Sequence, residues 1–81
     1  MRKLDMATAF ALVLKRHRAA KGMTQAVLAE KADLHTTYIG LIERSLRNPS
    51  LNVAKAIANA LDTPLTQIIS EAEQMYDKRA Q

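Results

Sequence analysis

The sequence predicts an all-α protein, a compact bundle of five helices. Apolar residues make up 48% of the 81 residues, and the only aromatic residues are one Phe and two Tyr, which suits packed helices better than a sheet. Glycine and proline occur only twice each, so the chain has few obligatory breaks. Apolar residues also recur at helical spacing in successive stretches. Because a chain of this length has room for one core, we expect a single domain over residues 1–81.

The first helix is expected from about Met6 to Lys21. Its apolar positions recur every three or four residues, as on a helix with one buried face; they are Phe10, Val13, Leu14 and His17. Gly22 follows at the point where a left-handed residue ends many helices.

A helix-turn-helix is predicted over residues 24–44. Thr24 is a good N-cap for a short second helix that turns Leu28 and Ala29 inward and ends near Ala32. Asp33 and Leu34 make a brief connection, and His35 or Thr36 can cap a third helix that buries Ile39 and Ile42. Two short helices joined this tightly are typical of the motif.

Two further helices complete the bundle. After an irregular loop over residues 44–49, Ser50 is expected to cap a fourth helix. This helix carries an apolar stripe of Leu51, Ala54, Ile57, Ala58 and Leu61. Proline at position 64 suits the start of a fifth helix from about residue 65. We expect this helix to fray by Lys78 and to bury, in its first turns, Leu65, Ile68 and Ile69.

Composition excludes several classes of function. The chain has no cysteine, so neither a disulfide nor a thiolate zinc site is available, and we expect a cytoplasmic protein. Its two histidines, His17 and His35, lie in different helices without a cluster of carboxylates, so we expect no metal, no cofactor and no catalysis. No segment approaches the roughly 20 apolar residues of a membrane span.

Charge is distributed unevenly along the chain. Residues 1–60 carry ten basic residues against four acidic ones, a net charge of +6, whereas residues 61–81 carry two against four, a net charge of −2. A basic body with a mildly acidic end fits a surface that faces a polyanion. A solvated surface with an accidental bias remains the alternative on charge alone.

An ordered set of short motifs covers roughly residues 10 to 70. The set consists of Gly22-Met23-Thr24-Gln25, Leu28-Ala29, Tyr38-Ile39, Leu41-Ile42-Glu43-Arg44 and Asn48-Pro49-Ser50-Leu51. It resembles the phage repressor and Cro superfamily of helix-turn-helix proteins. The resemblance implies a lambda-repressor-like DNA-binding fold and sequence-specific binding of double-stranded DNA.

The resemblance also implies roles for individual residues. In that family the second helix of the motif lies in the major groove, and its base-reading positions fall here on Thr36, Thr37, Gly40 and Leu41. The two threonines could instead only cap the helix. Phosphate contacts are implied for Thr24, Gln25, Arg44, Arg47 and Asn48, with Lys21 or Arg16 in reach, although any one of them could be only a solvated side chain.

Three further positions carry structural expectations. The resemblance implies an ion pair between Arg18 and Glu43 behind the DNA-facing surface. Asp33 and Ser45 stand where the family often has glycine, so we expect left-handed backbone at Asp33 and slight strain at Ser45.

The far end of the chain is interpreted as a dimerisation surface. Its apolar residues are Leu65, Ile69, Met75, Tyr76 and, less centrally, Leu61. A homodimer would present two reading helices to a near-palindromic operator. The alternative is that these residues only close the monomer's own core.

Three readings of the function stay open. The first is an autonomous transcriptional regulator without a small-molecule effector domain, as the short chain suggests. The second is an antitoxin-like module that binds a partner protein and regulates its own operon. The third is a helix bundle with no role on nucleic acid.

Overall fold

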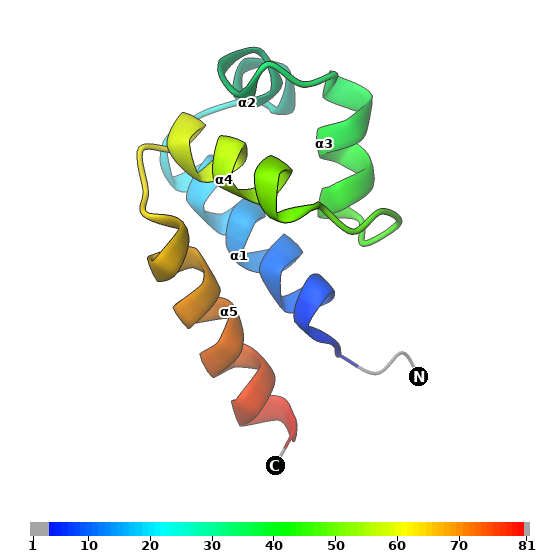
Figure 1. Cartoon of the computed structure of the whole chain (residues 1–81), viewed down its shortest axis with the longest axis vertical. Coiled ribbons are helices and arrows are strands. Elements are labelled where there is room, and N and C mark those ends of the chain that lie inside the picture. The colour runs from blue at the N-terminus through cyan, green and yellow to red at the C-terminus, as the bar shows by residue number, and fades with distance from the viewer. Residues whose placement is uncertain (1–3, 81) are drawn as a thin grey trace.

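The computed structural model describes residues 4–80, which form five α-helices and no strand (Figure 1). The helices are α1 (Met6–Ala20), α2 (Gln25–Ala32), α3 (Thr36–Glu43), α4 (Leu51–Ala60) and α5 (Leu65–Ala80). The predicted all-α bundle is confirmed, with every helix start within a residue of the expected one. The prediction for the end of α5 was wrong, because the helix continues past Lys78 to Ala80.

Side-chain caps explain where three of the helices begin. The side-chain oxygens of Asp5, Thr24 and Ser50 each accept a hydrogen bond from the backbone N–H three residues later, at 2.8, 3.1 and 3.1 Å respectively. Each bond satisfies a donor that the first helical turn leaves unpaired. The caps predicted at Thr24 and Ser50 are confirmed. His35 is the N-cap residue of α3, and its side chain makes no capping hydrogen bond.

Left-handed backbone follows each of the first four helices. The φ angles are +68° at Gly22, +58° at Asp33, +60° at Ser45 and +52° at Asp62. Glycine adopts this conformation without steric cost, whereas Asp and Ser adopt it with some strain. The expectations for Gly22, Asp33 and Ser45 are confirmed, and the turn at Asp62 was not anticipated.

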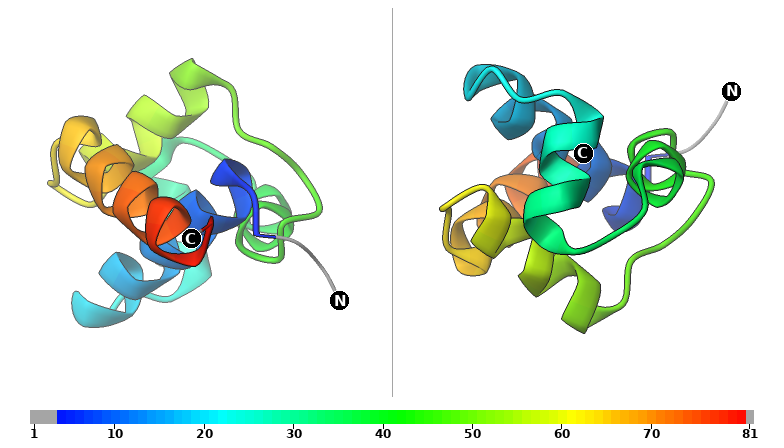
Figure 2. Two further views of the ribbon diagram at one scale, coloured as in Figure 1. Left: turned by 90° about the horizontal axis from the view of Figure 1, so that it is seen from below. Right: turned by 90° about the horizontal axis from the view of Figure 1, so that it is seen from above.

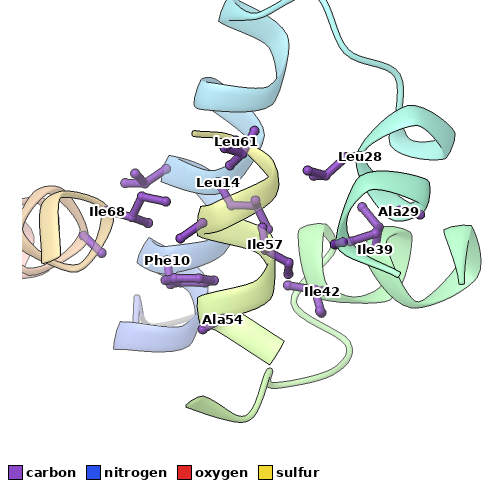
Figure 3. Packing of buried hydrophobic residues seen from close by; sticks show 14 of the residues in the cluster. Phe10, Leu14, Leu28, Ala29, Ile39, Ile42, Ala54, Ile57, Leu61 and Ile68 are labelled. Atoms are coloured by element: carbon purple, nitrogen blue, oxygen red, sulfur yellow. The ribbon is translucent and has the colours of Figure 1, made fainter. Parts of the chain in front are cut away.

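All five helices contribute to one hydrophobic core (Figure 3). Its largest buried side chains are Leu14, Leu28, Ile39, Ile42, Ile57, Leu61, Ile68 and Val13. In both views of Figure 2, α1 lies between α5 on one side and α3 on the other. The pairing of α1 with α5 is the most extensive in the molecule. No helix within residues 4–80 is long and apolar enough to cross a membrane.

The apolar stripe predicted for α4 needs two corrections. Leu51, expected on the buried face, is 78% exposed because the first turn of α4 projects beyond the core. Leu61 is fully buried, so its suggested part in a dimer surface was wrong. On α5, Ile68 is buried as expected and Leu65 is half-buried, but Ile69 remains 37% exposed.

This contrast within one stripe gives a stability prediction. Leu61→Ala should lower the free energy of unfolding by about 2–5 kcal/mol, because it removes a buried side chain and leaves a cavity. Leu51→Ala, the same chemical change at the exposed end of α4, should change it by less than about 0.5 kcal/mol. Urea unfolding followed by circular dichroism measures both. Equal losses from the two variants would contradict the difference in burial between Leu51 and Leu61.

Candidate nucleic-acid interface

Helices α2 and α3 form a tight unit at the end of the molecule opposite the C-terminal half of α5 (Figure 1). Only residues 33–35 connect them, and the turn is closed by the backbone N–H of Leu34, which donates to the carbonyl of Ala29 at 2.8 Å. Burial of Leu28 on α2 and of Ile39 and Ile42 on α3 holds both helices on the core. The opposite face of α3 is therefore turned outward.

The outward face of α3 carries three of the four predicted base-reading residues. Thr36 and Thr37 are exposed, and Leu41 is half-buried on the same side as Thr37, one turn later. Their side chains offer two hydroxyl groups and one apolar surface to a ligand.

Gly40, the fourth predicted reading residue, is buried. A Cβ atom at this position would lie 3.5 Å from Oε1 of Gln25 and 3.9 Å from Nη2 of Arg44. The groups nearest to Gly40 are thus side chains of α2 and of the loop that follows α3.

The predicted ion pair between Arg18 and Glu43 is present and almost entirely buried. Nε of Arg18 donates to Oε2 of Glu43 at 2.7 Å, and Nη2 donates to Oε1 at 3.0 Å. The side chains are only 14% and 2% exposed. The hydrogen bond with Glu43, and secondarily its charge, raise the pKa of Arg18 against the opposing effect of burial. Nη1 of Arg18 also donates to the carbonyl of Met23 at 2.7 Å, so the pair extends to the segment that leads into α2.

Gln25 is directed toward this buried pair. Its Nε2 donates to Oε1 of Glu43 at 3.0 Å, so one carboxylate on α3 binds side chains from both α1 and α2. The family resemblance implies that Gln25 contacts a phosphate. One hydrogen of its side-chain amide is engaged with Glu43 in this structure, and the second can still donate to another acceptor. The hydroxyl of Thr24 accepts a hydrogen bond from the backbone N–H of Val27 and can still donate its own hydrogen.

The loop over residues 44–50 places cationic side chains beside α3. Arg44, Arg47 and Asn48, which the resemblance implies as phosphate ligands, are all exposed. Nε of Arg44 donates to the carbonyl of Gly40 at 3.2 Å, and the Arg47 guanidinium lies 5.9 Å from the centre of the Tyr38 ring. A cation at this distance over an aromatic face is attracted to it.

Sequence reasoning assigned no role to Tyr38. Its contact with Arg47 depends on the path of the intervening loop, including the left-handed turn at Ser45. Nothing in the spacing of the two residues indicated that they would meet.

The predicted dimerisation residues on α5 divide into two groups. Leu65, Met75 and Tyr76 pack partly against the monomer's own core, whereas Ile69 remains exposed. Two shallow hollows share Ile69. One lies between α4 and α5 and is lined by Lys55, Pro64, Leu65, Thr66, Ile69, Ser70 and Glu73. The other is mostly apolar and is lined by Met6, Ala7, Phe10, Asn48, Pro49, Ser50, Leu51, Ala54 and Ile69.

The apolar surface that lines these hollows therefore lies beside the N-terminal half of α5 and does not include Met75 or Tyr76. We call the surface made by Leu51, Lys55, Leu65, Ile69 and Glu73 the α4–α5 face. Sequence reasoning missed Leu51 here because the helical spacing assigned it to the core. Within residues 4–80 there is no cluster of His, Cys, Asp or Glu that could hold a metal ion.

Comparison with known proteins agrees with this geometry. Residues 14–68 match the family model described as helix-turn-helix. Over 68 residues the chain is 37% identical to an immunity repressor protein of Bacillus phage phi105, covering 84% of this chain and 47% of the repressor. Over 67 residues it is 33% identical to the control protein C.SmaI of Serratia marcescens, covering 83% of this chain and 80% of that protein. The chain thus spans about half the length of the phage repressor.

A solved structure extends the likeness to three dimensions. A crystal structure of a point mutant of the restriction-modification controller protein C.Esp1396I superposes with a TM-score of 0.86 at 29% identity. The match covers 93% of this chain and 97% of the controller protein. The likeness therefore includes α5 as well as the helix-turn-helix.

The buried ion pair gives a second stability prediction. Glu43→Ala should lower the free energy of unfolding by about 3–5 kcal/mol, because it leaves the Arg18 guanidinium largely buried without its partner. The control is Glu30→Ala on the exposed side of α2, which should change the free energy by less than about 0.5 kcal/mol. Thermal or urea unfolding distinguishes the two. An unchanged stability in Glu43→Ala would show that the pair has no structural role.

Proposed function

This chain belongs to the helix-turn-helix family of DNA-binding transcriptional regulators, a non-enzymatic family, and we propose that it binds a near-palindromic operator as a homodimer through the major groove. The observation that carries the proposal is the outward face of α3. The exposed Thr36 and Thr37 and the half-buried Leu41 on this face are flanked by the exposed cations of the following loop. An α-helix fits the major groove, and cations beside it fit the phosphates that border the groove.

Base reading in this proposal depends on Thr36, Thr37 and Leu41. A threonine hydroxyl can hydrogen-bond a base edge, and its methyl group or a leucine side chain can contact the methyl group of thymine. None of these side chains makes the bidentate contact that Arg, Asn or Gln makes with a purine. Direct discrimination is therefore modest, and DNA shape and deformability supply the remainder.

Contacts with the sugar-phosphate backbone set the register of α3 in the groove. Arg44, Arg47 and Asn48 would bind phosphates on one side of the reading helix, and Thr24 with the first turn of α2 would bind them on the other. Neutralising phosphates releases counterions, so binding should weaken steeply as salt increases.

A second copy of the chain is the proposed occupant of the α4–α5 face. Leu65 and Ile69 provide apolar surface in the same hollow as Lys55 and Glu73, two side chains of opposite charge that belong to no ion pair among residues 4–80. In a two-fold interface the same patch meets itself, so the lysine of one copy can oppose the glutamate of the other. Two reading helices would then lie about 34 Å apart, one turn of DNA.

The names of the relatives suggest the biological setting. An immunity repressor and a restriction-modification control protein are the kinds of regulator that the chain matches. We infer a comparable role here, the control of transcription from a promoter that contains the operator.

Selection from a randomised DNA pool at about 0.15 M salt tests the reading surface without a prior guess at the operator. We expect an inverted repeat with half-sites about one helical turn apart. The combined substitutions Thr37→Ala and Leu41→Ala should abolish the enrichment, because they remove one polar and one apolar base contact. Asn59→Ala, exposed on α4, is the control and should leave it intact. An unenriched pool for the unaltered protein would refute sequence-specific binding.

A charge exchange tests the α4–α5 face. Lys55→Glu or Glu73→Lys should each weaken self-association on the order of tenfold, because like charges then face each other on both sides of the two-fold axis. Combining the two substitutions should restore it, since opposite charges again meet. Analytical ultracentrifugation measures the dissociation constants. Single variants that associate like the parent protein, or a combined variant that is not rescued, would exclude this face.

A further inference from the structure

The loop after α3 begins with a backbone motif that is bonded to the end of that helix. The N–H of Ser45 donates to the carbonyl of Ile42 at 3.0 Å, and the N–H of Leu46 donates to the carbonyl of Leu41 at 2.9 Å. With the left-handed backbone at Ser45, these two bonds form a Schellman motif, which satisfies carbonyls at the end of a helix. Residues 44–46 are therefore held by α3 itself.

Beyond this motif the chain leaves α3 without further hydrogen bonds. Within the described part of the chain, residues 47–49 make no hydrogen bond, and the next ones belong to the cap of α4 at Ser50. The interaction that joins the Arg47 side chain to α3 is its contact with the aromatic ring of Tyr38. The guanidinium carbon lies over this ring, 5.9 Å from its centre.

We propose that Tyr38 is a positioning residue for DNA binding, because its ring holds the Arg47 guanidinium beside α3 in the absence of DNA. The inference rests on the proposed function, in which Arg47 binds a phosphate at the border of the groove. A long side chain that is free in solution loses rotamer freedom when it binds a ligand. A side chain that is already held loses less, so its contact with the phosphate is stronger.

The contact with the ring leaves Arg47 able to bind a phosphate. A cation is attracted to the electron-rich face of an aromatic ring, and this attraction uses none of the guanidinium N–H donors. Arg47 is exposed and forms no ion pair within residues 4–80, so these donors are not committed to another group. Arg44 differs, because its Nε already donates to the carbonyl of Gly40.

Tyr38 is suited to this role because its own position is fixed. It precedes the fully buried Ile39 on α3, and its half-buried side chain packs against the hydrophobic core. The hydroxyl of Tyr38 makes no hydrogen bond to any residue that the structure describes. The ring is therefore the part of the side chain that acts on Arg47, and a phenylalanine at this position should act in the same way.

Binding to a duplex of arbitrary sequence tests the positioning role, because phosphate contacts do not depend on sequence. Fluorescence anisotropy with a duplex of about 20 base pairs at about 0.05 M salt gives the Kd. Tyr38→Leu keeps apolar packing but removes the ring, and it should raise the Kd about two- to fivefold. Tyr38→Phe keeps the ring and should bind like the parent protein. The control Tyr76→Leu, at the chain's other tyrosine, should also leave the Kd unchanged.

A double-mutant cycle separates the loss of positioning from other effects of the substitution. In an Arg47→Gln background, Tyr38→Leu should change the Kd less than about 1.5-fold, because no guanidinium remains to be held. Arg47→Gln should reduce the slope of log K against log salt by about one, whereas Tyr38→Leu keeps the charge and should leave the slope unchanged.

Two results of these binding measurements would overturn the proposal. Equal losses from Tyr38→Leu in both backgrounds would mean that the ring does not act through Arg47. A Tyr38→Phe variant that binds as weakly as Tyr38→Leu would mean that the hydroxyl itself contacts DNA.

Limited digestion with trypsin tests the same contact without DNA. Trypsin cleaves after Arg44 and after Arg47, and each cleavage rate reports how often that arginine is released from the folded protein. The initial rate after Arg47, divided by the rate after Arg44, should be about two- to fivefold higher in Tyr38→Leu than in the parent protein or Tyr38→Phe. A general loss of stability exposes both sites and leaves the ratio unchanged. An equal ratio in all three proteins would overturn the positioning role.

The two experiments distinguish failure of this inference from failure of the proposed function. If the parent protein binds no duplex even at low salt, DNA binding fails and the positioning role falls with it, while the digestion still shows whether Tyr38 holds Arg47. If the parent protein binds DNA but neither the cycle nor the digestion responds to Tyr38→Leu, DNA binding stands and the positioning role is excluded.

Discussion

The arrangement of the helix-turn-helix depends on one buried carboxylate. Glu43, at the end of α3, accepts hydrogen bonds from Arg18 on α1 and Gln25 on α2. A carboxylate this deeply buried is tolerated only with a charged and hydrogen-bonded partner. Because both partners come from other helices, satisfying the charge requires that α1, α2 and α3 adopt one mutual orientation. The outward direction of α3 follows from this requirement together with the burial of Ile39 and Ile42.

The polar contact at Glu43 separates two surfaces with different chemistry. On one side are the exposed face of α3 and the cationic loop that follows it, where Arg47 lies over the ring of Tyr38. On the other side α5 packs along α1 and, with α4, exposes Ile69 beside Lys55 and Glu73. Helix α1 connects these surfaces, because its last turns contact α3 and α5 through adjacent residues. The two surfaces are therefore connected through neighbouring residues of one helix.

Much of the fold could be predicted because the relevant signals are local. A cap such as Thr24 or Ser50 acts on a backbone N–H three residues away, and the left-handed turn at Gly22 depends on that residue alone. Helical spacing likewise identifies which positions share a face. The Arg18–Glu43 pair was anticipated from the family resemblance alone. Its partners are 25 residues apart, so no local rule connects them.

The sequence by itself determined five helices and their starts, the caps at Thr24 and Ser50, and the left-handed backbone at Gly22, Asp33 and Ser45. Only the tertiary structure decided how far the core extends along each apolar stripe. Leu51 and Leu61 share a helical face, yet one is exposed and the other is buried, because the core ends before the first turn of α4. The structure also directed Gln25 toward Glu43 and brought His17 to Glu71, 54 residues away. Such contacts depend on the positions and crossing angles of packed helices, which arise from the packing of the whole core and not from any local pattern.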